Sequence, residues 1–388
     1  MSVGTSTTRP SFAAILTGAQ DSPTSGVAAN DDVHLDAFSG TDDEKLTAAI
    51  DIARVSSPRR AIRLSARDHR FTQSRTTFSG MRILGPEQGL RGAGPVGTTA
   101  PQAPGRCTVT LDCGTGAASW LVGTATTYNV MVAGITFTST NAATQFYHHP
   151  SSAGTCYGAT LDTLSFHGFK HVLGTPVEPF SMTQVTTKGS WRCMGARDTQ
   201  FTLRGCDNTL WVSGDLHHGS ARTGRGTFLM RFSHLAKTTV RHLFLTTRSG
   251  ARAILVEGPA LRHGGLDISD CVVEGRHLDD PATGALIVVQ GGGVSFTNTT
   301  LNFGTPRPTD FSDGTDTALI MVKGGTAQIT NTWTCRATGP SESVPVIAVS
   351  GGAAYVSRVM GTGEAGQARG ARTGGTLVAD ETLMVACA

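Results

Sequence analysis

The sequence has little charge, few aromatic residues and no long hydrophobic run. Only 16% of its 388 residues are charged and 6% are aromatic. No stretch of about 18 apolar residues occurs, so no transmembrane helix or membrane insertion is expected. The net charge is +3 and no long Lys/Arg block is present, which argues against nucleic acid as the principal partner. Residues 1–20 lack the charged start and apolar core of a secretory signal, so export by the general pathway is not expected.

Paired cysteine motifs are also missing. The eight cysteines form no Cys-x-x-Cys pair, and several of them lie in apolar strand patterns. Buried free thiols are the favoured interpretation, with zinc ligands or disulfides as the alternatives. We therefore predict no metal and no cofactor.

Glycine is abundant, with 48 residues, and long helical Leu/Ala/Glu/Lys stretches are nearly absent. This bias favours strands and tight turns. Residues 1–30 are rich in Ser, Thr, Gly, Pro and Ala without periodicity, which predicts an extended arm or attachment segment, and also fits disorder.

One helix is predicted, over about residues 41–55. Thr41 and Glu44 have the spacing of a capping box, and apolar residues recur at helical spacing from Leu46 to Ala53. Ser57-Pro58 ends the run. A short helix with one apolar stripe is suited to closing the open end of a stack of strands.

An internal repeat follows, with strand patterns from about residue 59 to 388. Apolar runs end in Val-x-Gly beginning at Val172, Val212, Val256, Val289, Val322 and Val349, and Val378 continues the series without the Gly. A second strand motif lies between most of these runs and ends in Asp270, Asn298, Asn331 or Arg358. Each unit has the content of one β-helix coil, which buries its apolar face only by stacking on its neighbours. We predict one domain over residues 31–388, with the glycines at one corner and the Asp/Asn residues as a structural polar ladder at another.

The segment from Val33 to Asp43, with the helix and the strand Ile62-Arg63-Leu64 after it, resembles the entry segment of the pectate-lyase-like parallel β-helix superfamily. The resemblance covers about 35 residues closely; Ser65-Ala66-Arg67 replaces the usual Pro-Gly. It implies an all-β, right-handed parallel β-helix solenoid with a short N-terminal capping helix. The Ser/Thr-rich arm and Gly-rich coils look most like phage tailspikes and minor tail proteins. That resemblance implies a homotrimer on a virion, with other phage tail or baseplate proteins and host cell-surface polysaccharide as partners.

Carboxylates are the candidates for catalysis. Sugar hydrolysis uses two of them, about 5 to 9.5 Å apart. Aligning the Val-x-Gly repeats places Glu257 at the position of Ser213 one coil earlier, with Asp215 two residues beyond, so the pair Asp215 and Glu257 is predicted to share one face. The alternative is that both are solvated corner residues without a catalytic role. The acidic group around Asp267 and Asp270 lacks the spacing of a calcium site.

Histidines and aromatic residues complete the candidate site. His217, beside His218, is a candidate acid/base group, and His148-His149 is a second pair; paired histidines are usually polar surface. Trp191 and Tyr147 are predicted to stack on sugar rings, and Trp211 is either such a residue or part of the core.

The sequence therefore supports a phage tail protein that is structural and binds host-surface glycan. The alternatives are a glycan-degrading enzyme that uses Asp215, Glu257 and His217, and a structural baseplate component without a ligand. An enzyme predicts converging carboxylates, whereas a binding protein predicts a flat face rich in Ser and Thr.

Overall fold

The computed structural model describes part of the chain. The described residues are 32–86, 107–114, 119–139, 145–167, 169, 171–174, 180–183, 186–188, 192–194, 200–204, 209–217, 228–233, 238–248, 252–258, 265–276, 285–302, 318–335, 345–362, 368–380 and 383–387. Predictions for residues 1–30 and for Trp191 lie outside them.

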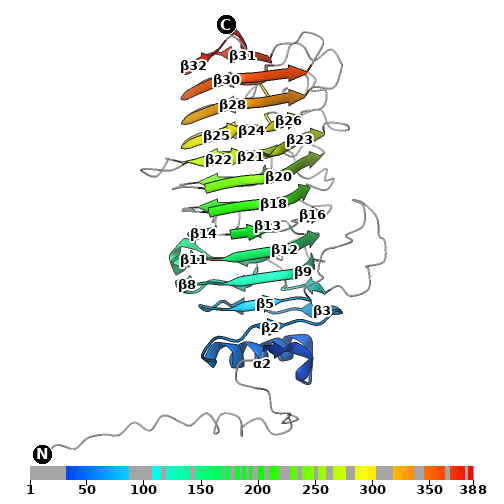
Figure 1. Cartoon of the computed structure of the whole chain (residues 1–388). Coiled ribbons are helices and arrows are strands. Elements are labelled where there is room, and N and C mark those ends of the chain that lie inside the picture. Colours follow the sequence, from blue (N-terminus) through cyan, green and yellow to red (C-terminus); the bar gives the residue numbers. More distant parts are fainter. Residues whose placement is uncertain are drawn as a thin grey trace, which may run out of the picture.

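Parallel strands stack coil upon coil above one helix, with the N-terminal coils at the base and the C-terminus at the top (Figure 1). The strands form two large sheets, here named sheet A and sheet B. Sheet A contains β1 (Val33–His34), β2 (Ile62–Arg63), β3 (Asp68–Phe71), β5 (Arg82–Leu84), β6 (Thr108–Leu111), β9 (Met131–Ser139), β12 (Thr160–His167), β15 (Thr186–Lys188), β16 (Arg192–Met194), β18 (Thr209–His217), β20 (Thr238–Arg248), β22 (Leu266–Ser269), β23 (Val272–Arg276), β25 (Gly293–Thr297), β26 (Thr300–Asn302), β28 (Thr326–Cys335), β30 (Ala353–Thr362) and β32 (Thr376–Ala379).

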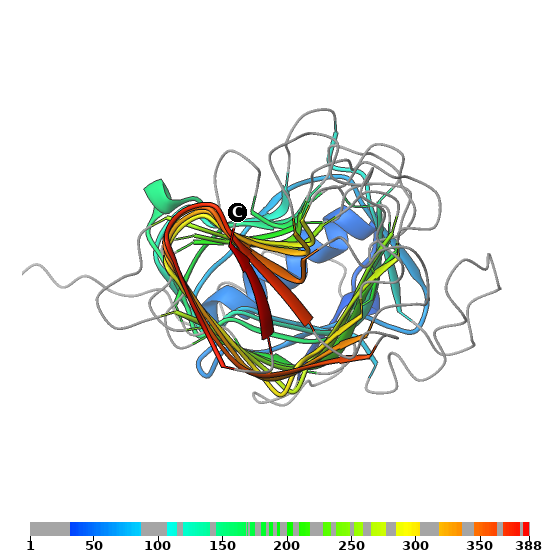
Figure 2. The same cartoon turned by 90° about the horizontal axis from the view of Figure 1, so that it is seen from above.

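Sheet B contains β4 (Arg75–Thr76), β7 (Ser119–Val122), β8 (Thr127–Tyr128), β10 (Gln145–His148), β11 (Cys156–Tyr157), β13 (His171–Leu173), β14 (Phe180–Thr183), β17 (Gln200–Arg204), β19 (Phe228–Ser233), β21 (Arg252–Glu257), β24 (Ile287–Val289), β27 (Ile320–Val322), β29 (Ile347–Val349), β31 (Ala368–Arg372) and β33 (Leu383–Cys387). The predicted all-β, right-handed parallel β-helix is confirmed. Seen from above, the sheets superimpose coil by coil around one core (Figure 2).

The helix α2 (Asp42–Val55) lies at the base, with the 3₁₀ turn η1 (Leu35–Ala37) before it and another, η2 (Ser151–Ala153), later in the chain. The predicted capping box is present: the Thr41 side chain accepts a hydrogen bond from the Glu44 amide, and the Glu44 carboxylate accepts one from the Thr41 amide. Leu46, Ala49, Ile50 and Ala53 are buried on the helix face that meets the first coil. The helix therefore covers the core end, as its single apolar stripe predicts.

Salt bridges hold this cap in place. Arg67 donates to the carboxylates of Asp36 and Asp42, with both contacts at 2.7 Å. Hydrogen bonding from Arg67 lowers the pKa of Asp36 to about 2. Burial opposes ionisation of Asp42, but the hydrogen bonds from Arg67 and from the Arg70 amide still lower its pKa. The acidic residues that start α2 thus clamp the helix to the loop after β2.

The core is a continuous column of Val, Ile, Leu and Phe side chains. Its N-terminal part is aromatic: the Trp120 ring lies 5.5 Å from Phe71 and 5.4 Å from Phe137, and Phe137 lies 5.5 Å from Phe166. These rings come from successive coils and are all buried. Stacking along the axis is the expected result when equivalent inward positions carry rings.

Glycine forms one corner ladder, where β24, β27 and β29 lead into the next strand of sheet A. Gly292, Gly325 and Gly352 have φ values of 70°, 70° and 72°. A Cβ atom at Gly325 would lie 2.3 Å from the Gly292 carbonyl oxygen of the coil before. Residue size and backbone conformation therefore both require glycine there. The Gly of Val-x-Gly was predicted to need a positive φ or a close backbone approach, and the close approach is found: a Cβ atom at Gly291, Gly324 or Gly351 would lie 2.5 Å from a carbonyl oxygen of the coil before. The positive φ lies one residue later.

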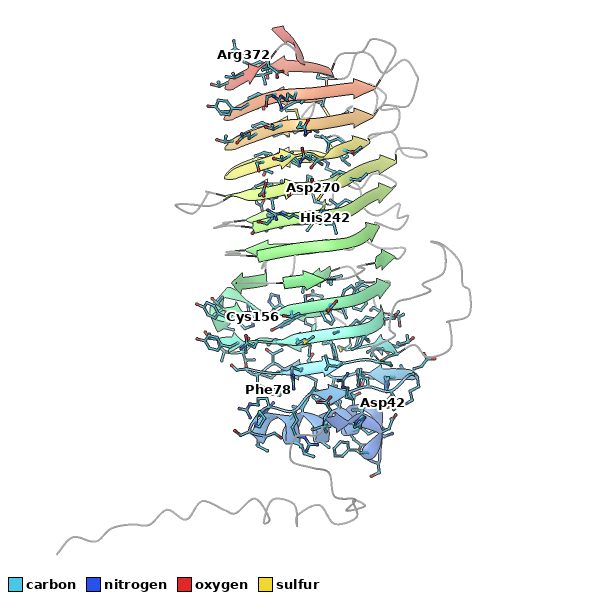
Figure 3. All side chains as sticks on the ribbon, viewed as in Figure 1. Asp42, Phe78, Cys156, His242, Asp270 and Arg372 are labelled. Carbon is cyan, nitrogen blue, oxygen red and sulfur yellow. The ribbon has the colours of Figure 1, made fainter. Side chains whose placement is uncertain are left out.

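A polar ladder forms the second corner, between the two strands that each coil contributes to sheet A. Asp270, Asn298 and Asn331 have φ values of 54°, 51° and 51°, and the Asn298 amide donates to Asp270 at 3.4 Å. The Asn331 amide donates in turn to Asn298. The predicted structural ladder is confirmed, and it extends to His242 and Arg358, which share the same backbone conformation. Figure 3 shows the positions of His242 and Asp270 on adjacent coils.

Two members of the predicted Val-x-Gly series are misassigned. Ser213 lies opposite His242, because Val212 pairs with Arg241 and Gly214 pairs with Leu243. This Val-x-Gly therefore belongs to the polar corner of sheet A. Val378 pairs with Tyr355 in sheet A, whereas the true continuation after Val349 in sheet B is Arg372.

Candidate functional site

The outer face of sheet B is apolar and covered in the C-terminal coils. Ile254 and Val256 point into the core, so Leu255 between them lies on the outer face. Leu255, Val288, Met321 and Ala348 succeed one another in register and are only 7%, 1%, 2% and 2% exposed. This stretch of sheet B is therefore not available as a ligand surface.

Sheet A presents a row of polar side chains instead, from half-buried to exposed. The row, which we name the outer row, consists of Thr239, Asp267, Ser295, Gln328 and Tyr355, joined in register through β20, β22, β25, β28 and β30. Each member lies between two buried residues of its own strand, and Gln328 and Tyr355 are exposed. The Ser295 hydroxyl donates to the Asp267 carboxylate at 2.7 Å, so neighbouring coils are linked within the row.

A second row runs beside it, next to the polar corner. It consists of Arg241, Ser269, Thr297, Thr330 and Ser357. Arg241 is exposed, and the Ser357 hydroxyl lies 3.4 Å from that of Thr330. Together the two rows form a face of hydroxyl, amide, carboxylate and guanidinium groups, which we name the open face.

The open face has the chemistry of a carbohydrate-binding surface. Hydroxyl and amide groups both donate and accept hydrogen bonds, as sugar hydroxyls do. Tyr355 adds a ring that is 47% exposed, and aromatic rings supply apolar contact area with a polar tip. The groups repeat at the coil spacing of about 4.8 Å, so the face suits a repeating ligand better than a single small molecule.

The predicted carboxylate pair does not share a face. Glu257 lies in β21 of sheet B, where it pairs with Ser233 and accepts a hydrogen bond from Arg231 at 2.5 Å. Asp215 lies in β18 of sheet A and pairs with Phe244. The prediction assumed that Val212 and Val256 hold equivalent positions in successive coils. They do not, because the Val-x-Gly motif occurs at two different corners. The catalytic roles of both residues stay predictions.

His217 keeps its place beside Asp215. Both residues lie in β18, two positions apart, and His217 pairs with Thr246 in β20. Residues two apart in a strand belong to the same face. The structure thus keeps Asp215 with His217 and separates both from Glu257.

The predicted sugar-stacking residues have different outcomes. For Tyr147 the prediction is wrong: the ring is fully buried, and its hydroxyl lies 3.5 Å from the Cys156 sulfur. Trp211 pairs with Val240, which is a buried core residue, and this register favours the core interpretation. His149, expected in a polar loop, is also fully buried. Burial and the neighbouring His148 lower the His149 pKa to about 4.

The exposed tyrosines are the residues that sequence reasoning missed. Tyr128 and Tyr157 are 52% and 36% exposed, and their rings stack with centroids 5.2 Å apart. Each precedes a residue with positive φ, Asn129 or Gly158. The signal available in the sequence was the dipeptide Tyr128-Asn129, followed 29 residues later by Tyr157-Gly158. This spacing is the length of one coil, so the two dipeptides lie at the same corner in successive coils.

Three of the cysteines lie in the core. Cys107, Cys156 and Cys271 are buried thiols, as favoured by the sequence. Burial raises the pKa of Cys107 to about 12 and that of Cys271 to about 11. Within the described ranges, no group of three or more His, Cys, Asp or Glu side chains is arranged to hold a metal ion. No helix in those ranges has the length and hydrophobicity to cross a membrane.

Comparison with solved structures supports the fold. The catalytic domain of Agl-KA aligns with 92% of this chain and 68% of its own length, at 10% identity and a TM-score of 0.50. DFA-IIIase from Arthrobacter chlorophenolicus A6 aligns over 94% and 92% of the two chains, at 11% identity and a TM-score of 0.48. The A-module of the mannuronan C-5 epimerase AlgE4 from Azotobacter vinelandii aligns over 92% and 97%, at 13% identity and a TM-score of 0.39.

Sequence comparison gives no family. No protein-family model matches the chain. No curated protein matches it by sequence. At these identities the structural similarity shows the fold alone.

Proposed function

We propose that this protein binds an extended polysaccharide along the open face of sheet A. The observation that carries the proposal is the contrast between the two sheets. The outward residues of sheet B in the C-terminal coils are apolar and covered, whereas the two rows of sheet A are polar, repeated in register and mostly half-buried to exposed. Carbohydrate-acting proteins among the solved structures with this architecture, such as the mannuronan C-5 epimerase, are consistent with that ligand class.

A polymer explains the repetition better than a small ligand does. Each coil of the two rows offers the same kinds of donor and acceptor one step further along the axis. Many weak contacts then add along the chain of the ligand. Affinity is expected to rise with the length of the oligosaccharide until it spans the row from Thr239 to Tyr355.

The test is binding of a panel of bacterial capsule and cell-wall polysaccharides and their fragments, measured by calorimetry or affinity electrophoresis. The variant Ser295→Ala/Gln328→Ala is expected to weaken binding by about thirtyfold, since two hydrogen bonds of about 1 kcal/mol each are removed. Ser350→Ala, at an exposed polar position of the sheet B corner, is the matched control. Equal binding by the open-face variant and the control would contradict the proposal.

Cleavage of the bound glycan is a second candidate. The register places Asp215 and His217 of β18 in the same band of sheet A as Glu274, because His217 pairs with Thr246 and Thr246 pairs with Glu274. Two coil steps, about 9.6 Å, separate the backbones of His217 and Glu274, whereas Asp215 is in register with Val272, two residues or about 7 Å further along the strand. The backbones of Asp215 and Glu274 are therefore roughly 12 Å apart, and their side chains must lean toward one another to reach the roughly 6.5–9.5 Å used in inverting hydrolysis. In this candidate Asp215 and Glu274 are the carboxylates, one as general acid and one as base.

Release of new reducing ends, or of products that absorb ultraviolet light, tests for cleavage. Activity that disappears in Asp215→Asn and Glu274→Gln, but persists in Glu257→Gln, would support catalysis by Asp215 and Glu274 on sheet A. Loss in Glu257→Gln together with full activity in Glu274→Gln would favour the pair predicted from the sequence.

A role in a phage tail is the finer proposal, and it rests on the resemblance of the N-terminal segment. This proposal includes assembly as a homotrimer, attachment to other tail or baseplate proteins, and a location in the virion. Light scattering coupled to gel filtration tests the trimer, which requires a mass of three times 40.4 kDa. A monomer mass at all concentrations would contradict that part of the proposal.

A further inference from the structure

Exposed arginines gather at the base of the solenoid. Arg54 near the end of α2 and Arg59 just after it both lie over the Phe78 ring, at 5.4 Å and 5.9 Å from its centroid. Arg82 of β5 donates to the Arg59 carbonyl oxygen at 3.2 Å. All three arginines are exposed.

The tyrosine stack continues this cluster upward. The Tyr128 amide donates to the Ser79 hydroxyl at 3.2 Å, and the Gly80 amide donates to the Tyr128 carbonyl at 2.7 Å. The Tyr157 ring then covers that of Tyr128. Figure 3 shows Phe78 at the base, on the same side of the solenoid as β8 and β11, which carry the tyrosines. We name Arg54, Arg59, Arg82, Phe78, Tyr128 and Tyr157 the basic aromatic edge.

The charge of this edge is not neutralised within the described part of the chain. Arg63, Arg67, Arg70 and Arg75 nearby each form a salt bridge with an aspartate. In the same described ranges no carboxylate forms a salt bridge with Arg54, Arg59 or Arg82, although Asp51 is exposed on the same helix. Guanidinium charges that no carboxylate of the described ranges balances are available to a ligand of opposite charge.

We propose that the basic aromatic edge is a binding site for an acidic polysaccharide, with the guanidinium groups on the carboxylates and the tyrosine rings on the sugar faces. Guanidinium is suited to this because its fork of donors matches a carboxylate. The edge spans the coils of β2, β5, β9 and β12, about 14 Å along the axis, which is several sugar units and not one. This inference rests on the proposed function and adds the class of polymer and a second contact area.

Nucleic acid is the competing ligand for arginines beside aromatic rings. The open face favours polysaccharide, because the hydroxyl and amide groups of its outer row match sugar hydroxyls. The net charge of only +3 and the lack of a long Lys/Arg block also disfavour a phosphate backbone. The same polymer can run upward from the edge, since β9 and β12 lead from the tyrosines into sheet A.

The experiment measures binding of alginate and polygalacturonate, each beside its neutral ester, to the full chain. The unmodified chain is expected to bind the charged polymers at least about tenfold more tightly than the esters, with affinity that falls as salt is added. Arg59→Gln/Arg82→Gln is expected to reduce binding of the charged polymers about five- to tenfold and to leave the esters unaffected. Tyr128→Ala is expected to weaken both about threefold. Arg372→Gln, an exposed arginine at the far end, is the matched control.

Equal binding of charged polymers by Arg59→Gln/Arg82→Gln and by the control would overturn the inference. Tighter binding of single-stranded DNA than of any polysaccharide, lost in the same variant, would overturn it in favour of nucleic acid. If open-face variants abolish binding of charged and neutral polymers, while the edge variants bind both kinds of polymer as tightly as the unmodified chain, only this inference fails. If no polysaccharide binds at all, the proposed function fails with it. Unfolding curves recorded for each variant identify any loss that comes from misfolding.

Discussion

The glycine corner ladder makes a quantitative prediction about stability. In Gly325→Ala the new methyl group would lie 2.3 Å from the Gly292 carbonyl oxygen and 2.7 Å from the Gly291 carbonyl carbon. Both atoms are backbone, and the Gly292 oxygen also accepts a hydrogen bond from the Thr326 amide at 2.9 Å. Relief of the clash therefore requires the two coils to separate at this corner.

The cost can be worked from two parts. Holding alanine in the left-handed region costs about 1–2 kcal/mol, and weakening the Thr326 hydrogen bond costs about 1 kcal/mol more. The smaller entropy of the unfolded alanine chain offsets roughly 0.4–1 kcal/mol only where the native conformation is compatible, which it is not here. A loss of about 2–3 kcal/mol is expected, a large share of the ~5–15 kcal/mol that stabilises a typical domain.

Urea unfolding followed by circular dichroism measures this loss, with Gly293→Ala as the matched control. Gly293 is one residue beyond the corner, and a Cβ atom there would meet nothing within 4 Å. We expect the Gly293→Ala midpoint to stay near that of the original chain while the Gly325→Ala midpoint falls clearly. Equal midpoints for the two variants would refute the reasoning that the left-handed backbone and the close stacking of coils require glycine at residue 325.

Three further predictions concern the cap, the core and the thiols. Because the folded pKa of Asp36 is lowered to about 2, its salt bridge stabilises the protein above the ordinary value of 3.8 and is lost as the pH falls from about 4 toward 2. Arg67→Met should therefore reduce stability at pH 7 and flatten this acid limb in urea titrations; an unchanged limb would contradict the clamp. Trp120→Ala, in the buried aromatic column, should cost about 3–5 kcal/mol in the same assay, and a loss below 1 kcal/mol would show that the column is loosely packed. Cys107 and Cys271, whose burial raises their pKa values, should resist alkylation at pH 8 until urea is added, so rapid labelling of the folded protein would contradict their burial.

The sequence predicted the fold through features that act locally or repeat. Thr41 and Glu44 identified the capping helix because a capping box depends only on residues three apart. Asp270, Asn298 and Asn331 identified a corner because each coil places a residue of left-handed conformation at the same point. His242 and Arg358 hold the same position without the Asn signal, since position in the stack, and not residue type, sets their conformation.

The candidate site was less predictable because it depends on register between coils. Val212 and Val256 carry the same local motif, yet they lie at different corners, and one false equivalence was enough to pair Asp215 with Glu257. Tyr147 has polar neighbours in sequence, but Leu121 and Leu173 flank it in the stack and leave it in the core. The open face also became visible only once strands separated by about 30 residues were placed side by side.

Footprinting of the polysaccharide complex tests the central claim most directly. Hydroxyl-radical labelling, read residue by residue with mass spectrometry, reports the exposure of Tyr355 and Gln328 on the open face. The account predicts that a bound polysaccharide protects Tyr355 and Gln328 while the outward residues of sheet B, already covered, do not change. Binding that leaves Tyr355 and Gln328 fully labelled and protects residues of sheet B instead would contradict it.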